Sequence, residues 1–307
     1  MRRNKLKRDF LNISDLTKEE VLELISYAKK LKKDIFSDQS LKGKSVGLIF
    51  MKPSTRTRLS FEVGVYQMGG QPLYITGSST QLSRGEEIKD TGRVMSRYLD
   101  GIVIRTYSHN EVVQLAEYFD GPVINALTDY LHPCQILADL QTIHEIFGTL
   151  ENIKIAYVGD GNNVANTWLI AGGLIGLSLS VATPQGFEPS GKAVYEAMNL
   201  CKNSGGEIIL TNDPFEAVKD ADVIYTDVWV SMGQEKENEK KKQFKGFTVN
   251  GELLKNASKK AVVLHCLPAH KGEEITEDVF EQFSDVIFQQ AENRLHVQKA
   301  LMSLLFK

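Results

Sequence analysis

The chain has 307 residues, of which 42% are hydrophobic and 24% charged, so it is long enough to bury a sizeable core and to form two domains. Its formal net charge of -3 gives no excess of positive charge, which argues against nucleic acid or a membrane surface as a partner. Three cysteines without a CxxC pair suggest neither a disulfide framework nor a structural zinc site.

The start of the chain is basic but lacks the apolar stretch of a signal peptide. No run approaches the roughly 18 to 20 consecutive apolar residues that a membrane helix needs. We therefore expect a cytoplasmic protein that makes no membrane contact.

Short apolar runs rich in β-branched residues alternate with segments of helical period along the whole chain. The runs in the first half are Ser45–Phe50, Pro72–Thr76, Gly101–Arg105 and Pro122–Ala126. Those in the second half are Ile153–Val158, Leu179–Thr183, Glu207–Leu210, Val223–Thr226, Ala261–His265 and Val286–Phe288. Continuous apolar runs are typical of strands covered on both faces, so the sequence predicts an α/β fold with two parallel, helix-flanked sheets.

Two helical segments set the expected domain boundaries. Gln135–Phe147 is followed by Gly148 as a stop signal, and Glu292–Phe306 has the pattern of a terminal helix that packs back on the body. We expect a first domain at residues 1–134 completed by a helix at 290–307, a linking helix at 135–148, and a second domain at 149–289. The charge run Gln234–Lys242 is interpreted as a solvated loop or a frayed helix.

A group of hydrogen-bond donors follows the first predicted strand. Ser54-Thr55-Arg56-Thr57-Arg58 opens the helical stretch Leu59–Met68. Ligands of parallel sheets bind at the carboxyl ends of strands, and hydroxyls, guanidinium groups and backbone N–H groups at a helix start suit a phosphate-sized dianion. The simpler alternative is an N-cap followed by surface arginines, but five consecutive donors after a strand favour an anion site.

Three further polar residues are expected at the same edge of the first sheet. Arg105 ends the third strand, and His132 and Gln135 follow the fourth. Arg105 and His132 can donate hydrogen bonds to a carbonyl oxygen, while Gln135 offers an amide oxygen and nitrogen to an NH2 group of the ligand. A histidine alone is more often a capping or packed residue, but its place beside two arginine clusters favours a role in binding.

The segments Ser54–Glu62, Arg105-Thr106 and His132-Pro133-Cys134-Gln135 resemble the carbamoyl phosphate site shared by aspartate and ornithine carbamoyltransferases. The resemblance implies further residues of that site: Arg294, in Glu292-Asn293-Arg294, matches an arginine that returns to the carbamoyl phosphate side, and Gln81 reaches the site of a neighbouring subunit. A homotrimer, or an assembly of trimers, follows from that analogy. The residues that it assigns to carbamoyl phosphate in this first half are Ser54, Thr55, Arg56, Thr57, Gln81, Arg105, His132, Gln135 and Arg294.

The second half supplies the expected site for the acceptor. Gly159–Asn163, Asp227–Gly233 and His265–Pro268 all follow predicted strands, so they should face the first site across a cleft between the domains. An amino-acid acceptor needs donors for its carboxylate and acceptors for its ammonium group. Asn163 suits the carboxylate, whereas Asp227 and Ser231 suit the ammonium group.

The Ser-Met-Gly and His-Cys-Leu-Pro segments look like the ornithine-specific signatures, because aspartate enzymes carry His-Pro-Leu-Pro at the second place. The resemblance implies that ornithine contacts Asn163, Asp227, Ser231 and Met232. It places Cys266 beside the reacting amine and the Leu267 carbonyl on the carbamoyl group, so both also count as carbamoyl phosphate ligands. The residues implied to be catalytic are Arg56, Arg105, His132 and Cys266.

The activity implied is transfer of a carbamoyl group from carbamoyl phosphate to the side-chain amine of L-ornithine, giving L-citrulline and phosphate, without a cofactor or metal. Two alternatives stay open: transfer to another amine, such as putrescine or an N-acylornithine, and a non-catalytic relative with a regulatory or scaffold role. A dinucleotide site after the fifth strand is disfavoured, because Val164 stands where the third glycine of the G-x-G-x-x-G pattern belongs. A Cys266–His265 nucleophile pair is also disfavoured, since adjacent residues of a strand point to opposite faces.

Overall fold

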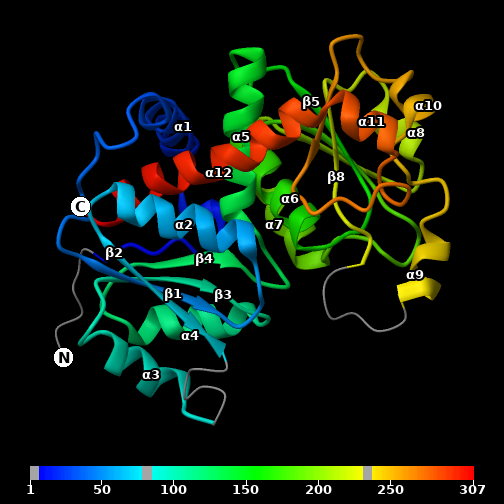
Figure 1. Ribbon diagram of the computed structural model, residues 1–307. Helices are drawn as coiled ribbons and strands as arrows, with labels where there is room; N and C mark the ends of the chain where they lie inside the picture. Colours follow the sequence, from blue (N-terminus) through cyan, green and yellow to red (C-terminus); the bar gives the residue numbers. More distant parts are fainter. Residues whose placement is uncertain (1–6, 78–84, 231–236) are drawn as a thin grey trace. The chain divides into compact units, whose positions relative to one another are not determined.

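The computed structural model describes residues 7–77, 85–230 and 237–307 (Figure 1). The chain divides into two compact units, one made of Met1–Gln141 with Glu292–Lys307 and the other of Thr142–Ala291. Both divisions fall inside helices, α5 (Pro133–Phe147) and α12 (Ser284–Leu305). Each unit contains a parallel sheet flanked by helices, which confirms the predicted fold class.

The sheet of the first unit has the order β2-β1-β3-β4. Its strands are β1 (Ser45–Phe50), β2 (Gln71–Thr76), β3 (Gly101–Arg105) and β4 (Val123–Leu127). Its further helices are η1 (Ile13–Asp15), α1 (Lys18–Lys33), α2 (Thr55–Gln67), α3 (Ile88–Met95) and α4 (His109–Tyr118). Helices α3 and α4 lie on one face of this sheet, while α1, α2 and the end of α12 lie on the other (Figure 1).

Burial on both faces explains the continuous apolar runs of the first unit. Every residue of β3 and β4 is buried, and only the first residue of β1 is partly exposed. The side chains of Ile49, Ile102 and Ile104 pack with Val112 and Leu115 of α4. Strand β2 lies at the edge of the sheet and is partly exposed throughout, so its sequence is more polar.

The sheet of the second unit has the order β7-β6-β5-β8-β9. Its strands are β5 (Lys154–Val158), β6 (Ser178–Ala182), β7 (Glu207–Thr211), β8 (Val223–Thr226) and β9 (Val262–His265). Its helices are α6 (Asn163–Ile175), α7 (Gly191–Ser204), α8 (Pro214–Val218), α9 (Glu237–Gln243), α10 (Gly251–Leu254) and α11 (Glu277–Gln282). One core of this unit joins Ala156 and Val158 to the aromatic side chains of Trp229, Phe244 and Phe247.

The strand orders locate a switch point in each sheet. In the first sheet the chain moves from β1 outward to β2. It then crosses to the other side of β1, where it forms β3 and, next to it, β4. In the second sheet it moves from β5 to β6 and β7 on one side and through β8 to β9 on the other. Loops that diverge at such a point leave a crevice at the carboxyl ends of the strands, where ligands of this architecture bind.

Two local predictions are wrong. Val286–Phe288, predicted as a strand, lies in α12, where Ile287 is buried and Phe288 exposed, as on a helix with one covered face. Three apolar residues in a row do not distinguish a strand from a helix. The charge run is helical from Glu237 rather than a loop, and the side chain of Lys240 is largely buried, so that part is not fully solvated; residues 234–236 lie outside the described residues.

No helix in the described part of the chain is both long enough and apolar enough to span a membrane.

Candidate active site

The start of helix α2 forms the first part of the site. Ser54 is the N-cap residue in an extended conformation, and its hydroxyl accepts a hydrogen bond from the Thr57 N–H at 3.2 Å. The N–H groups of Thr55 and Arg56 precede the first intrahelical bond and therefore point out of the helix end, where the helix dipole also favours an anion. Such a helix end is chemically suited to a phosphate group.

The two guanidinium groups of this segment have different surroundings. Arg58 pairs with Glu62 at 2.9 Å and lies over the Tyr74 ring at 3.8 Å, so its charge is already engaged on the surface of the unit. Within residues 7–77, 85–230 and 237–307, Arg56 has no hydrogen bond or ion pair. Of these two arginines, Arg56 is therefore the better candidate for an anion contact.

Thr57 joins three distant parts of the first unit. Its hydroxyl is fully buried and accepts a hydrogen bond from Arg294 of α12 at 2.7 Å. Arg105, at the end of β3, donates to the same oxygen at 3.5 Å. Both guanidinium groups are more than nine-tenths buried, and burial strengthens their attraction for an anion. The structure therefore brings together three of the predicted residues that lie far apart in sequence.

His132 lies in the same cluster and is uncharged at neutral pH. Burial and the positive charges of Arg294 and Arg105 hold the pKa of its imidazole well below the ordinary value of 6.5. A neutral imidazole carries one N–H and one acceptor nitrogen, so His132 can hydrogen-bond a polar ligand without adding a charge. The positive charge of this cluster therefore comes from its arginines.

Gln135 lies on the first turn of α5 and is almost completely buried. Its amide nitrogen donates to Asp139 at 2.8 Å, while its amide oxygen has no partner among the described residues. A buried acceptor without a partner is costly, and an N–H donor of a ligand would satisfy it. The structure thus supports the amide oxygen of Gln135 as a contact for an NH2 group, while one N–H of its amide nitrogen is engaged by Asp139.

The second group of predicted residues is built on the switch point of the other sheet. Asn162 caps α6 by accepting from the N–H groups of Val164 and Ala165 at 2.8 and 3.2 Å. Its amide nitrogen donates to Asp227 Oδ2 at 2.8 Å, which links the loop after β5 to the loop after β8. Asn163, the predicted ornithine ligand, is the first residue of α6 and is half-buried.

Asp227 and Cys266 are in direct contact. The Cys266 thiol donates to Asp227 Oδ1 at 2.9 Å, and the Val228 N–H donates to the same oxygen at 2.8 Å. Asp227 is buried, so these donors and Asn162 stabilise a carboxylate away from water. The arrangement places an anionic group and a neutral thiol side by side.

His265 is bonded to groups other than the Cys266 thiol. Its Nδ1 accepts from the Leu267 N–H at 2.8 Å, and its Nε2 lies 2.9 Å from the fully buried Glu274. Because Nδ1 accepts, Nε2 carries the proton and donates it to Glu274. The bond to Nδ1 also holds Leu267 at a φ of +61°, a conformation that branched residues rarely adopt. His265 therefore positions the Cys266-Leu267 turn.

Three of the predicted site residues, Gln81, Ser231 and Met232, lie outside the described residues. Cys266 and Leu267, also predicted to bind carbamoyl phosphate, belong to the second unit. The other described residues predicted for that ligand belong to the first unit: Ser54, Thr55, Arg56, Thr57, Arg105, His132, Gln135 and Arg294.

Both halves of the chain match models of one protein family. Residues 8–145 match the carbamoyl-P binding domain of aspartate/ornithine carbamoyltransferase, and residues 151–305 match its Asp/Orn binding domain. The chain belongs to the aspartate/ornithine carbamoyltransferase family.

Individual members of this family are similar over nearly the whole chain. The ornithine carbamoyltransferase of Carboxydothermus hydrogenoformans is 54% identical, over 97% of this chain and 97% of the relative. That of Aquifex aeolicus is 51% identical, over 98% and 99%. The solved ornithine carbamoyltransferase of Pyrococcus furiosus has a TM-score of 0.93 at 49% identity and covers 98% of this chain and 97% of its own.

Sequence reasoning missed several residues that support the site of this family member. Asn162 was predictable, because an asparagine before a helical stretch is a common N-cap, although its bond to Asp227 was not. Glu274 lies nine residues after His265 in a loop, and Lys240 lies in a charge run. Local sequence gives no signal that either side chain turns inward.

Proposed function

We propose that this protein transfers the carbamoyl group of carbamoyl phosphate to the side-chain amine of L-ornithine, giving L-citrulline and phosphate. The observation that carries the proposal is the pairing of two sites in one chain. One is a buried cationic cluster around Thr57, and the other is a buried carboxylate, Asp227, held by neutral donors. The first suits a phosphorylated dianion and the second suits an ammonium group.

The names of the relatives support the same acceptor. Proteins about half identical to this chain over nearly its full length are named ornithine carbamoyltransferase. In the second unit, the segment after β9 reads His265-Cys266-Leu267-Pro268. Cys266 is the residue of this segment that distinguishes ornithine enzymes from aspartate enzymes. Its thiol contacts the carboxylate of Asp227, which we propose binds the acceptor.

The reaction we propose is direct attack by a neutral amine. An alkyl amine with a pKa of about 10.4 is neutral in roughly one molecule in two thousand at pH 7, so the site must select or deprotonate it. We assign Arg105, His132 and the Thr57 hydroxyl to stabilising the developing oxyanion, and Arg56 to stabilising the departing phosphate. The phosphate, with a second pKa of about 6, is a suitable acceptor for the amine proton.

The surroundings of Cys266 favour direct attack over a covalent intermediate. A cysteine nucleophile requires a nearby base, but both ring nitrogens of His265 are engaged, by Leu267 and Glu274. The thiol itself donates to Asp227. We therefore assign Cys266 to orienting the amine.

The experiment that tests this function measures formation of the ureido product from carbamoyl phosphate with ornithine, aspartate, putrescine and N-acetylornithine in parallel. We expect a strong preference for ornithine. Arg56→Gly is the matched variant: Arg56 has no hydrogen bond or ion pair among the described residues, so the variant should fold and lose most activity. Turnover with another acceptor would refute the roles of Asn163 and Asp227 in binding ornithine. No turnover with any acceptor would refute the proposal that the protein is a carbamoyltransferase.

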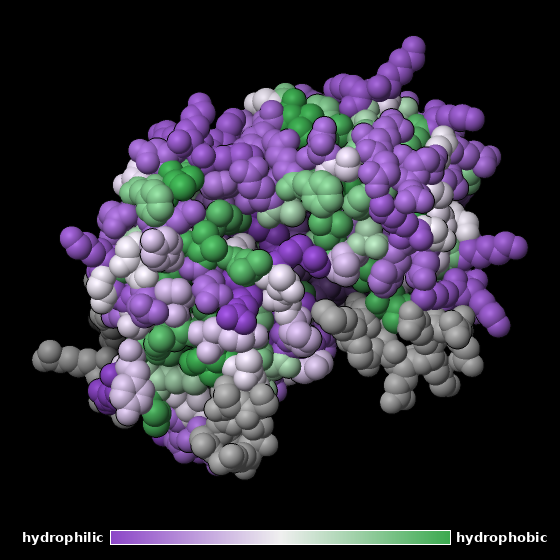
Figure 2. All heavy atoms as spheres, viewed as in Figure 1, coloured by the Kyte–Doolittle hydropathy of each residue, from purple (hydrophilic) through white to green (hydrophobic). Residues whose placement is uncertain are grey.

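We also propose that copies of the chain associate, as a trimer or an assembly of trimers. Figure 2 shows hydrophobic side chains gathered over the part of the face where α2 lies. Three residues of that helix expose much of their apolar surface: Leu59 at 53%, Val63 at 38% and Tyr66 at 67%. Such a contiguous patch is typical of an interface between proteins.

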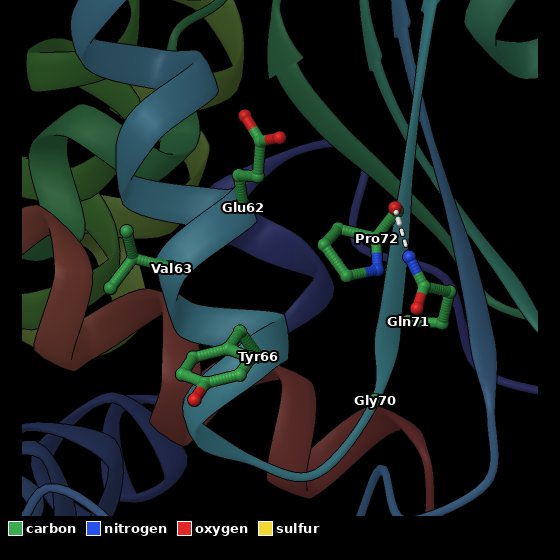
Figure 3. Close-up of a pocket in the computed structure, with 6 residues that line it drawn as sticks. All are labelled: Glu62, Val63, Tyr66, Gly70, Gln71 and Pro72. Carbon is green, nitrogen blue, oxygen red and sulfur yellow. Dashed lines mark hydrogen bonds between the residues drawn. The ribbon is translucent and has the colours of Figure 1, made fainter.

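The same helix borders a pocket beside the edge strand. Figure 3 shows the residues that line it, Glu62, Val63 and Tyr66 of α2 and Gly70, Gln71 and Pro72 at the start of β2. An edge strand next to an apolar helix offers a second copy of the chain both a concave surface and unpaired backbone N–H and C=O groups. Sedimentation equilibrium should give a mass of three chains or a multiple of it, and the mass of a single chain would contradict association.

A further inference from the structure

Lys240 of α9 makes a contact that no predicted site residue shares. Its ammonium group lies 2.7 Å from Asp160 Oδ2, and the two side chains are only 16% and 9% exposed. The same nitrogen lies 5.5 and 5.8 Å from the ring centres of Phe187 and Phe244. The ammonium group therefore lies near two aromatic rings that pack on each other, and it pairs with a nearly buried carboxylate.

Asp160 belongs to the turn after β5 that carries the proposed acceptor residues. The Tyr157 hydroxyl donates to the Asp160 carbonyl at 2.8 Å, and the Gly161 N–H donates to the Phe187 carbonyl at 2.9 Å. A Cβ at Gly161 would lie 2.3 Å from the backbone of Glu188, so this side of the turn is closely packed. On the other side, it is the Lys240 ion pair that holds the Asp160 side chain.

The ion pair connects to Asp227 through one residue. Asn162 donates to Asp227 Oδ2, and its own N–H donates to the Asp160 carbonyl at 2.7 Å. Asp160 and Asp227 are thus two carboxylates in one small cluster. Burial and the charge of Asp227 raise the pKa of Asp160, and Lys240 opposes both effects.

We propose that Lys240 is a positioning residue for the amino-acid acceptor: by pairing with Asp160 it fixes the turn that presents Asn162 and Asn163 beside Asp227. It also cancels the charge of Asp160, so that an ammonium group of the acceptor is drawn to Asp227. This inference rests on the proposed function. It predicts a much larger effect on ornithine than on carbamoyl phosphate, most of whose proposed ligands, those around Thr57, lie in the other unit.

The test compares Lys240→Met with Lys241→Met by steady-state kinetics. Lys241 is the next residue of α9 and also forms an ion pair, at 2.7 Å with the half-buried Glu273. For Lys240→Met we expect the KM for ornithine to rise about tenfold or more, as for loss of a hydrogen bond to a charged group. Its kcat and its KM for carbamoyl phosphate should change by less than about twofold, and Lys240→Arg should recover part of the ornithine affinity.

A folded Lys240→Met enzyme with the wild-type KM for ornithine would overturn the inference, as would equal changes for both substrates or an equal effect of Lys241→Met. If Lys240→Met fails to fold because Asp160 is left buried and unpaired, Lys240→Met/Asp160→Asn carries the test. In that variant a raised ornithine KM supports the inference, and a wild-type value overturns it. A wild-type protein that does not carbamoylate ornithine would instead refute the proposed function itself.

Discussion

Thr57→Val is the sharpest perturbation of the cationic cluster. Valine has nearly the shape of threonine but no hydroxyl, and Thr57 is completely buried, so the change removes one oxygen without opening a cavity. That oxygen accepts from Arg294 at 2.7 Å and from Arg105 at 3.5 Å. Thr57→Ser is the matched control, because it keeps the hydroxyl and loses only a methyl group.

The size of the effect follows from the shorter bond. A hydrogen bond to a charged group contributes about 1.5 to 3 kcal/mol, whereas a contact of 3.5 Å adds little. Since about 1.4 kcal/mol corresponds to a factor of ten, kcat/KM for carbamoyl phosphate should fall roughly 10- to 100-fold in Thr57→Val. The fall has two causes: Arg294 loses the group that orients it, and the ligand loses a hydroxyl donor.

The assay is citrulline formation at saturating ornithine with varied carbamoyl phosphate, accompanied by urea denaturation to show that each variant is folded. Thr57→Ser should stay within a few-fold of the wild type. The reasoning would be refuted by a Thr57→Val enzyme within about threefold of the wild type. It would also be refuted if Thr57→Ser were as impaired as Thr57→Val, because the hydroxyl would then be irrelevant.

Two further predictions concern Cys266 and His132. Cys266→Ser keeps a hydrogen-bond donor for Asp227, so kcat should fall by no more than about tenfold. Loss of an obligatory nucleophile costs on the order of 10⁴-fold or more in kcat. A loss of that size in Cys266→Ser would therefore contradict direct attack. The folded-state pKa of His132 is depressed, so the unfolded chain binds an extra proton below about pH 6.5. The contribution of His132 to the free energy of unfolding is therefore complete above that pH and is lost as pH falls towards the folded-state value. Urea denaturation from about pH 7.5 to 5.5 should show a weaker pH dependence in His132→Asn, and identical curves for both proteins would contradict the assignment.

The sheets were predictable because their strands are buried on both faces. The residues of β3 and β4 are all covered, so selection for apolar side chains acts on every position and leaves a continuous run. Residues that follow such runs, among them Arg105 and Asp227, lie at the carboxyl ends of strands. The rule for ligand sites in parallel sheets therefore identified candidates without knowledge of the strand order.

The contacts between side chains were not predictable. The Lys240–Asp160 and His265–Glu274 pairs depend on where a helix or loop returns to the sheet, and neither partner differs in type from an ordinary surface residue. The same holds for Arg58, which local sequence could not distinguish from Arg56 although the structure pairs it with Glu62. Charged residues follow no periodic sequence pattern of their own. Tertiary packing therefore decides whether a charged side chain points into the protein or towards solvent.

The charges of the two sites also constrain how ornithine is bound under the proposed mechanism. A carboxylate favours the protonated form of any amine that lies against it, yet the reacting amine must be neutral to attack. Asp227 therefore suits the α-ammonium group of ornithine. The side-chain amine, which has to react, instead needs an uncharged neighbouring group. Cys266 provides one, because its thiol occupies Asp227 Oδ1 and presents an uncharged sulfur. Replacing that thiol by a carboxylate would hold the reacting amine in its protonated form, so under the proposed mechanism Cys266 assists transfer as an uncharged neighbour, without forming a bond to the carbamoyl group.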